Sequence, residues 1–170
     1  MQKQDLVIRA IREADIDAVQ NFLLGQLQEL FAQEGQLAIT NDIWGIRKTY
    51  LEPINCNMWG VFTRLGEVVG TAAICTYNDR IELLKGRYDL PITAEVGRFY
   101  IDKSLRRQGL GSNLVKTLTD FCIKQGYLIM YLHTHRFLPG GFNFWEKQGF
   151  VITIDEGGSA EIVHMEKILT

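Results

Sequence analysis

The residues best suited to chemistry in this chain form the segment 106–112, Arg-Arg-Gln-Gly-Leu-Gly-Ser, which lies between a predicted strand and a predicted amphipathic helix. The two glycines let the main chain come close to a bulky anion, and the first amides of the helix point toward such a ligand. Lys103 and the two arginines add positive charge that suits a pyrophosphate or a ribose phosphate. The segment therefore predicts a phosphate-binding loop, with a solvated basic turn at an ordinary helix start as the alternative.

Two widespread nucleotide-binding motifs do not fit this loop. A P-loop requires Gly-Lys-Ser or Gly-Lys-Thr, but Gly111 is followed by Ser112 and Asn113. A dinucleotide-binding fingerprint requires a third glycine where this chain has Leu114. Neither nucleotide-binding fold is therefore predicted around the loop.

The elements that position the loop are predicted from apolar periodicity and turn residues. Runs rich in β-formers predict strands over residues 6–11, 59–63, 68–77, 94–101, 128–132, 150–155 and 161–169. Apolar residues at helical spacing predict helices after Asp15 as a cap, near Asp42, over 110–125 and after Pro139. Gly126 is the expected C-cap of the helix over 110–125. Residues 65–67, Leu-Gly-Glu, predict a hairpin turn, and the order of elements contains both hairpins and a parallel crossover. The predicted fold class is therefore α/β (α+β), with a mixed, mostly antiparallel sheet of six to seven strands flanked by about four helices.

The composition is that of an ordinary globular chain. Its 170 residues carry a net charge of −2, 46% are apolar and 22% are charged, which favours one domain over residues 1–170 and no general nucleic-acid surface. The longest run without Asp, Glu, Lys or Arg is 11 residues, far below the ~20 of a membrane-spanning helix. The N-terminal residues lack the apolar run of a secretory signal, and three cysteines form neither a disulfide framework nor a zinc pattern. We therefore expect a cytoplasmic protein without a bound metal.

Two segments resemble the GNAT superfamily of acyl-CoA-dependent N-acyltransferases. The loop matches the signature Gln/Arg-x-x-Gly-x-Gly/Ala, and residues 144–150, Phe-Trp-Glu-Lys-Gln-Gly-Phe, are similar to the family's Phe-Tyr-Glu-Lys-x-Gly-Phe segment. The predicted order of elements resembles the family along essentially the whole chain. The resemblance implies an N-acetyltransferase that uses acetyl-CoA as co-substrate. It would move the acetyl group to an amine of a small molecule or peptide by direct attack on the thioester.

The resemblance also implies which residues hold acetyl-CoA. Main-chain amides from Arg106 or Arg107 to Ser112 would hold the pyrophosphate. The strand around Tyr100 would pair with the pantetheine arm where it diverges from the strand at 128–132, and the amide near Phe99 would face the thioester oxygen. The implied cofactor-binding residues are Phe99, Tyr100, Ile101, Arg106, Arg107, Gln108, Gly109, Leu110, Gly111, Ser112 and Trp145.

Transfer to an amine requires a proton acceptor, because an alkylammonium has a pKa of about 10.4. Glu95 lies 11 residues before Arg106 and resembles in position the strand glutamate that is the general base in part of the family. The structural alternative for Glu95 is an ion pair with Arg98 or Arg87.

Two histidines follow the predicted buried strand. His133 and His135 are spaced so that both lie on one side if the strand continues. Either could relay protons, and a hydrogen-bonded structural histidine is the alternative. A metal site is not predicted, because no third ligand has suitable spacing.

Trp145 departs from the family pattern. It stands where many members carry a tyrosine that protonates the departing thiolate, and an indole cannot act as that acid. Tyr100, Tyr131 or solvent would take the role, or the thiolate would leave unassisted; aromatic core packing is the structural alternative for Trp145. The predicted catalytic residues are therefore Glu95, Tyr100 and His133. The missing tyrosine also permits another class of function, a non-catalytic sensor or regulatory module that binds acyl-CoA.

The acceptor is expected to be chosen by segments 26–50 and 77–92, which match no common pattern. Arginines that would favour an acceptor carboxylate are Arg80, Arg87 and Arg98. Acidic residues that would favour a polyamine are Glu82, Asp89 and Glu95. The predicted partner is thus a small-molecule or peptide amine, without nucleic acid or membrane, and a homodimer is left open.

Overall fold

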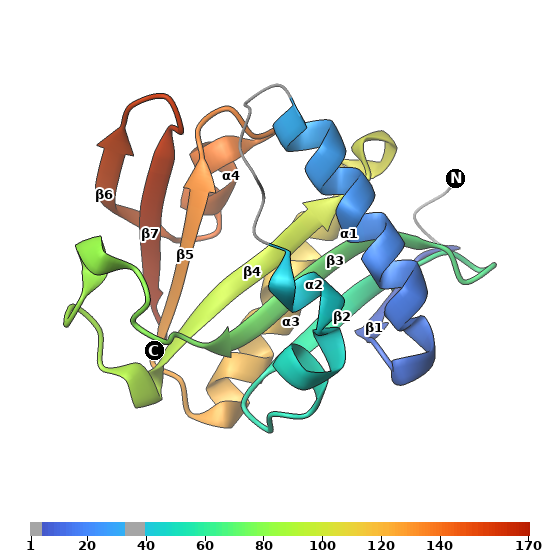
Figure 1. The fold of residues 1–170 in the computed structure, drawn as a ribbon, viewed down its shortest axis with the longest axis horizontal. Helices are drawn as coiled ribbons and strands as arrows, with labels where there is room; N and C mark the ends of the chain where they lie inside the picture. The colour runs from blue at the N-terminus through green and yellow to red at the C-terminus, as the bar shows by residue number, and fades with distance from the viewer. Residues whose placement is uncertain (1–4, 33–39) are drawn as a thin grey trace. The chain divides into compact units, whose positions relative to one another are not determined.

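The computed structural model describes residues 5–32 and 40–170. Seven strands join in one sheet in the order β1-β2-β3-β4-β5-β7-β6 (Figure 1). They are β1 (Val7–Ala10), β2 (Asn57–Phe62), β3 (Val68–Thr76), β4 (Thr93–Ile101), β5 (Ile129–His135), β6 (Val151–Gly157) and β7 (Ile162–Ile168). The pairs β1–β2, β2–β3, β5–β7 and β6–β7 are antiparallel and β4–β5 is parallel, which confirms the predicted mixed, mostly antiparallel sheet.

The chain divides into two compact units. The first unit contains the described residues of 1–74 together with 97–116, and the second contains 75–96 and 117–170. Strands β3 and β4 and helix α3 (Leu110–Gln125) each contribute residues to both units.

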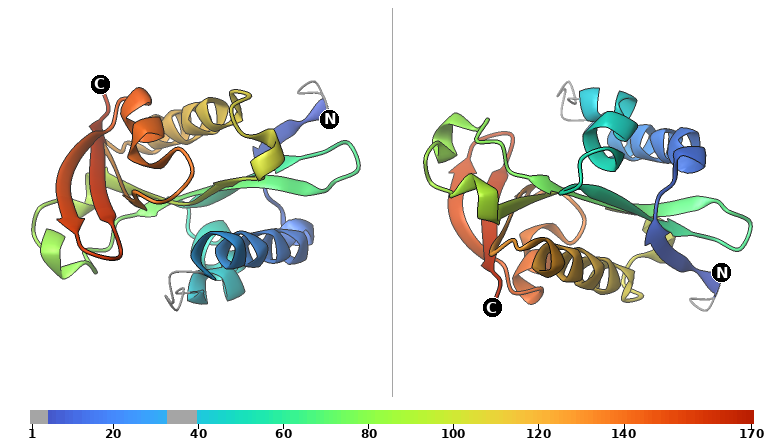
Figure 2. Two further views of the ribbon diagram at one scale, coloured as in Figure 1. Left: turned by 90° about the horizontal axis from the view of Figure 1, so that it is seen from above. Right: turned by 90° about the horizontal axis from the view of Figure 1, so that it is seen from below.

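The first unit combines a β-hairpin with the helices α1 (Ile16–Phe31) and α2 (Asn41–Trp44). At the turn between β2 and β3, Gly66 has a φ of 83° and the Thr63 amide donates to the Glu67 carbonyl, as expected for a hairpin. Figure 2 shows α1 and α2 on one face of β1 to β3, and the start of α3 on the opposite face. A π-helical turn (Arg47–Leu51) follows α2.

The sequence predicts Asp15 as the cap of α1, and Asp15 does occupy the N-cap position, but its side chain makes no capping hydrogen bond to that helix. Its carboxylate accepts a hydrogen bond from the Arg12 amide at 2.7 Å and two from the Arg9 guanidinium at 2.8 and 3.0 Å. These contacts stabilise a 3-10 turn (Glu13–Asp15) that leads into the helix. The predicted cap position of Asp15 is therefore confirmed, whereas its carboxylate caps the turn before α1 rather than α1 itself.

The second unit is organised around β5. Residue pairs from Thr93↔Ile129 to Glu95↔Tyr131 join β5 to β4, and β7 pairs with its other edge. The middle residues of β5 are buried, which agrees with the buried strand predicted at 128–132. Helix α3 ends at Gly126, as predicted, and α4 (Gly141–Lys147) contacts β5.

Within the described part of the chain, no helix has the length and apolar character that a membrane span requires. The same residues contain no group of three or more histidines, cysteines or acids arranged to hold a metal ion. Cys56, Cys75 and Cys122 are free thiols.

Candidate functional site

The predicted phosphate-binding loop lies in the first unit, directly before α3. A 3-10 turn (Lys103–Leu105) precedes it, and Asp102 caps this turn by accepting a hydrogen bond from the Ser104 amide at 2.9 Å. The Nε atom of Arg106 donates to the Ile101 carbonyl at 2.9 Å. These contacts fold the chain tightly between the end of β4 and the start of α3.

The backbone of this loop contains two left-handed residues. Arg107 has a φ of 61° and Gly109 a φ of 82°. Glycine adopts this region freely, whereas a non-glycine residue there costs about 1–2 kcal/mol. The first-turn amides of a helix face an anion at its N-terminus, and the ladder of α3 begins where the Asn113 amide donates to the Gly109 carbonyl at 3.1 Å. The loop geometry therefore fits a pyrophosphate, and the strain at Arg107 is typical of a functional loop.

Strand β4 also contains a left-handed residue, Arg98, which has a φ of 48°. Such a residue inside a strand is typical of a β-bulge, which bends the strand and re-aims the residues after it. The carbonyl of Arg98 accepts a hydrogen bond from the Thr71 hydroxyl at 2.8 Å. Because an arginine is strained in this region, its surroundings must hold the conformation.

A partly buried ion pair in the first unit holds the Arg98 side chain. Its Nε and Nη2 atoms donate to the two carboxylate oxygens of Asp42 at 2.8 and 2.6 Å, and the Tyr50 hydroxyl donates to Asp42 at 2.6 Å. Desolvation by burial would raise the pKa of Asp42, but the hydrogen bonds and charge of Arg98 outweigh it and the pKa falls below its ordinary value. Asp42 and Tyr50 were not predicted as site residues, because their role depends on the contact of Asp42 with Arg98, 56 residues away, and on the hydrogen bond from Tyr50 to Asp42.

Tyr100, a predicted acid, lies two residues after Arg98. Burial raises the pKa of Tyr100, and the charge of Arg98 only partly opposes this effect. The phenol therefore keeps its proton at neutral pH.

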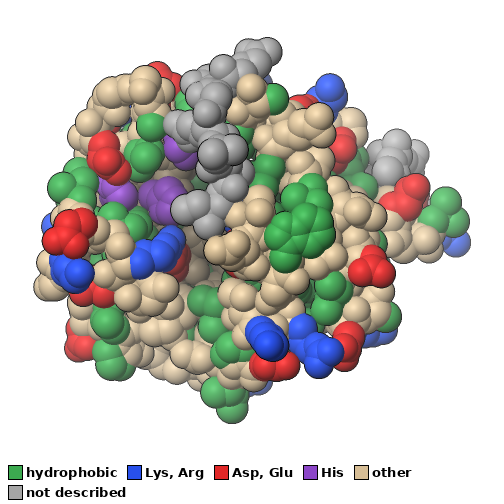
Figure 3. Space-filling model, viewed as in Figure 1, with side chains coloured by type: hydrophobic (Ala, Val, Ile, Leu, Met, Phe, Trp, Pro, Cys, Tyr) green, Lys and Arg blue, Asp and Glu red, His purple; other side chains and the backbone are tan. Residues whose placement is uncertain are grey.

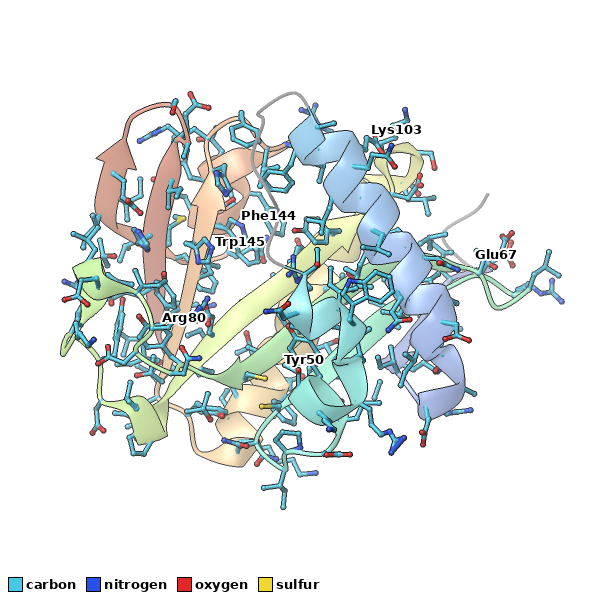
Figure 4. All side chains as sticks on the ribbon, in the orientation of Figure 1. Tyr50, Glu67, Arg80, Lys103, Phe144 and Trp145 are labelled. Atoms are coloured by element: carbon cyan, nitrogen blue, oxygen red, sulfur yellow. The ribbon has the colours of Figure 1, made fainter. Side chains whose placement is uncertain are left out.

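Glu95 lies in the second unit, where Arg80 binds both of its oxygens. The Nη1 atom donates to Oε1 at 2.5 Å and the Nη2 atom to Oε2 at 2.7 Å. Figure 4 shows Arg80 over the paired region of β4 and β5. The ion pair expected for Glu95 is therefore present, but with a partner that the sequence did not indicate.

The three arginines suggested for an acceptor carboxylate each have a protein carboxylate as partner. Arg80 binds Glu95, Arg98 binds Asp42, and Arg87 approaches Glu166 at 3.8 Å. A pairing of Glu95 with Arg98 or Arg87 is thus wrong. The support that these arginines gave to a carboxylate-bearing acceptor is correspondingly reduced.

His133 lies beside Glu95 without a direct hydrogen bond. Its Nδ1 atom is 3.8 Å from Glu95 Oε2, and 37% of its side chain is exposed. Burial by neighbouring atoms and the charge of Arg80 lower the pKa of His133 to about 4, so the imidazole is neutral at pH 7. In contrast, the His135 Nδ1 atom lies 2.6 Å from the Ala160 carbonyl, as expected for a structural histidine.

We expect the depressed pKa of His133 to make stability depend on pH. The unfolded chain binds the proton with a pKa near 6.5 and the folded chain with one of about 4, so stability rises with pH in this window and is lost as pH falls through it. The contribution is about 1 kcal/mol after allowance for solvent screening of this exposed side chain. Urea unfolding at pH 7 and pH 5 should therefore show a smaller loss on acidification for His133→Gln than for the wild type. Equal losses in both proteins would contradict the assignment.

A partly buried hydrogen-bonded chain on β5, β7 and β6 was not predicted. The Tyr131 hydroxyl lies 2.7 Å from His164 Nδ1, and His164 Nε2 lies 2.6 Å from a carboxylate oxygen of Glu156. His164 is 1% exposed, whereas the Glu156 side chain is 36% exposed. The strand register brings these residues together: His164 pairs directly with His133, so it lies diagonally opposite Tyr131, two residues earlier on β5. Figure 3 shows histidine side chains gathered on one face of this unit.

Tyr131, the other candidate acid, is fully enclosed. Tyr77 and Tyr88 pack against its ring with centroid distances of 5.0 and 5.5 Å, and Leu84 belongs to the same cluster. Burial raises the pKa of Tyr131, and its hydroxyl already contacts His164. Because it is 0% exposed, Tyr131 is a core residue rather than an acid that touches a substrate.

Trp145 takes part in aromatic packing on α4. Its ring lies edge-on to Phe144 and Phe150 with centroid distances of 4.9 and 5.3 Å. Figure 4 labels Phe144 and Trp145. The structural alternative for this position is confirmed, whereas a cofactor contact stays a prediction. Of the segment 26–50 expected to choose the acceptor, residues 33–39 lie outside the described residues.

Several solved structures are similar to this chain along nearly its whole length. The acetyltransferase of the GNAT family from Staphylococcus aureus MU50 is 16% identical, with a TM-score of 0.78, and the match covers 97% of this chain and 99% of that one. The PaiA N-acetyltransferase from Thermoplasma acidophilum, solved with coenzyme A, is 19% identical, with a TM-score of 0.68 and coverage of 96% and 99%. The spermidine N-acetyltransferase from Vibrio cholerae, solved with CoA and spermine, is 14% identical, with a TM-score of 0.67 and coverage of 98% and 96%. At these identities the likeness shows the fold.

A search of curated proteins gave no match. The family model described as "Acetyltransferase (GNAT) family" matches residues 19–150, which is most of the chain and includes the whole loop before α3. The chain therefore belongs to the GNAT family of acetyltransferases.

Proposed function

We propose that this chain moves an acetyl group from acetyl-CoA to an amine of a small molecule or peptide by direct attack on the thioester. The observation that carries the proposal is the loop before α3, where the left-handed residues Arg107 and Gly109 shape an anion-binding helix start. Acetyltransferases of this family use acetyl-CoA, which supplies an activated acetyl group as a thioester.

The chain's own backbone would hold the coenzyme at two places. The amides from residues 106 or 107 to 112 bind the pyrophosphate, and the exposed Arg107 adds charge. The backbone of β4 from Phe99 to Ile101 receives the pantetheine arm as an added strand. In the described residues the pairing of β4 with β5 covers three positions and ends at Glu95, which supports this use of the later residues of β4.

Glu95 is the proposed general base, acting through a water molecule. Arg80 fixes the orientation of the carboxylate, and an ionised carboxylate has further lone pairs beyond the two that Arg80 engages. His133, neutral and accessible, relays protons beside Glu95. Tyr100 is the proposed acid, because its raised pKa keeps a proton available for the departing thiolate.

Replacing Glu95 with glutamine is expected to lower kcat by about 10²- to 10⁴-fold, because proton removal from the amine loses its acceptor. The measurement is acceptor-dependent release of free CoA across a panel of amines and peptides. The affinity for CoA, measured by calorimetry, should stay close to that of the wild type, since Glu95 is not proposed to contact the coenzyme.

The matched control is Glu67→Gln, an equally conservative change at an exposed residue in the β2–β3 turn (Figure 4). It should leave kcat unchanged. Unaltered turnover in Glu95→Gln would exclude Glu95 as the base, and His133→Gln would then be the next variant to test.

A non-catalytic acyl-CoA sensor is the second candidate function. It is favoured by the Arg80 contacts, which occupy both oxygens of the proposed base. Binding of CoA by the wild type without any acceptor-dependent release across the panel would support the sensor and exclude the enzyme.

We also propose that residues 1–170 act as one domain in the cytoplasm. Three elements, β3, β4 and α3, contribute residues to both compact units, which supports the single domain. The three free cysteine thiols support a reducing compartment.

A further inference from the structure

We propose that Asp42 is a positioning residue: oriented by a hydrogen bond from Tyr50, it binds the Arg98 side chain, holds the left-handed conformation in β4, and so sets the backbone that receives pantetheine. The role in pantetheine binding rests on the proposed function, whereas the effect on β4 stands on the contacts of the first unit alone.

The contacts converge on the Asp42 carboxylate from two elements. Arg98 donates twice, at 2.8 and 2.6 Å, and Tyr50 once, at 2.6 Å. The side chains of Arg98 and Asp42 are 16% and 21% exposed, so water competes little for these hydrogen bonds. Figure 4 shows Tyr50 on the segment that follows α2, where a π-helical turn places it. Such turns are rare and occur frequently at functional sites.

The backbone of Arg98 needs this support. Arg98 has a φ of 48°, and a residue with a side chain relaxes from this conformation to the ordinary β region unless neighbouring contacts prevent it. A guanidinium held at two atoms has a fixed direction, and the Thr71 hydroxyl fixes the carbonyl of the same residue. With arginine rather than glycine at this position, the bulge depends on the carboxylate of Asp42.

Relaxation of the bulge would change the register of the residues that follow it. A shift of one residue in a strand moves every later side chain and backbone group to the other face. Only the fraction of molecules with the bulge intact would bind pantetheine, and the apparent affinity falls in proportion to that fraction. Saturating coenzyme would restore the bulge, so the Kd and the KM should change while kcat changes little.

The test compares two double variants that both lack the ion pair. In Asp42→Asn/Arg98→Ala, residue 98 stays strained but no ion pair holds it. In Asp42→Asn/Arg98→Gly, residue 98 is a glycine, which adopts this φ without strain. We expect Asp42→Asn/Arg98→Ala to bind CoA about tenfold more weakly than the wild type, and Asp42→Asn/Arg98→Gly to bind within about threefold of it. Both lack an unpaired buried charge, and their unfolding midpoints control for loss of folding.

Two measurements decide the outcome. Calorimetry with CoA gives the affinities, and hydrogen exchange of residues 97–101 reports the backbone of β4 without any ligand. Faster exchange in the alanine variant than in the glycine variant is expected. Equal exchange, or equal affinities in the two variants, would overturn the positioning role. If the wild type binds no CoA, the proposed function fails and the pantetheine role with it, while exchange still decides whether Asp42 holds the bulge.

Discussion

Replacing Gly109 with valine is expected to weaken CoA binding by about 100-fold. Gly109 has a φ of 82°, and a β-branched residue is a strong outlier there, costing about 3 kcal/mol or forcing the loop to rearrange. Rearrangement would move the amides that we propose to bind the pyrophosphate, and the added side chain would stand where the main chain is proposed to approach that group. Calorimetry with CoA measures the change directly.

The hairpin turn offers a matched control. Gly66 has nearly the same φ, 83°, lies in the same unit, and has no atom within 4 Å of an added Cβ. Gly66→Val should therefore lower the free energy of unfolding by a similar amount, about 1–3 kcal/mol, and leave the Kd for CoA unchanged. Equal weakening of CoA binding in the two variants would mean that strain alone, rather than the anion-binding loop, explains the loss.

Features set by local sequence were predicted well. The turn at Gly66, the end of α3 at Gly126 and the loop before α3 each depend on a glycine and its immediate neighbours. A turn with a positive φ, a helix start or a helix end requires particular residue types within a few positions, so each can be recognised in the sequence. Asp15 was placed correctly at the start of α1, but its side-chain partners were not predicted, because an acid that caps a helix and one that caps the 3-10 turn before it look alike in the sequence.

Contacts between distant segments were not predicted. Arg80 binds Glu95 from 15 residues away, and Asp42 binds Arg98 from 56 residues away. Neither partner has a local signal, since any exposed acid or base could form the pair and only the fold selects one. For His164 a signal existed, an isolated histidine between Val163 and Met165 in the last strand, but its partners depend on the register of three strands.

Replacing His164 with phenylalanine is expected to destabilise the protein by about 3 kcal/mol, a fall in Tm of about 6–12 °C. His164 is 1% exposed and contacts the Tyr131 hydroxyl at 2.7 Å and the Glu156 carboxylate at 2.6 Å. An ionised carboxylate only accepts hydrogen bonds, so His164 Nε2 donates to Glu156 and the lone pair of Nδ1 is left to accept from Tyr131. Phenylalanine removes both functions and leaves the Tyr131 hydroxyl buried without its partner.

A double-mutant cycle separates this polar effect from simple repacking. Tyr131→Phe removes the hydroxyl that His164→Phe leaves without its partner, so the double variant should lose at least about 1 kcal/mol less than the sum of the two single losses. Glu156→Gln should cost less than about 1 kcal/mol, because the amide oxygen still accepts from His164 and the side chain is 36% exposed. Additive losses at positions 131 and 164 would instead mean that shape alone, and not the hydrogen-bonded chain, determines the stability of this core. The cycle thus tests whether the sheet of the second unit depends on a histidine whose two ring nitrogens serve different partners.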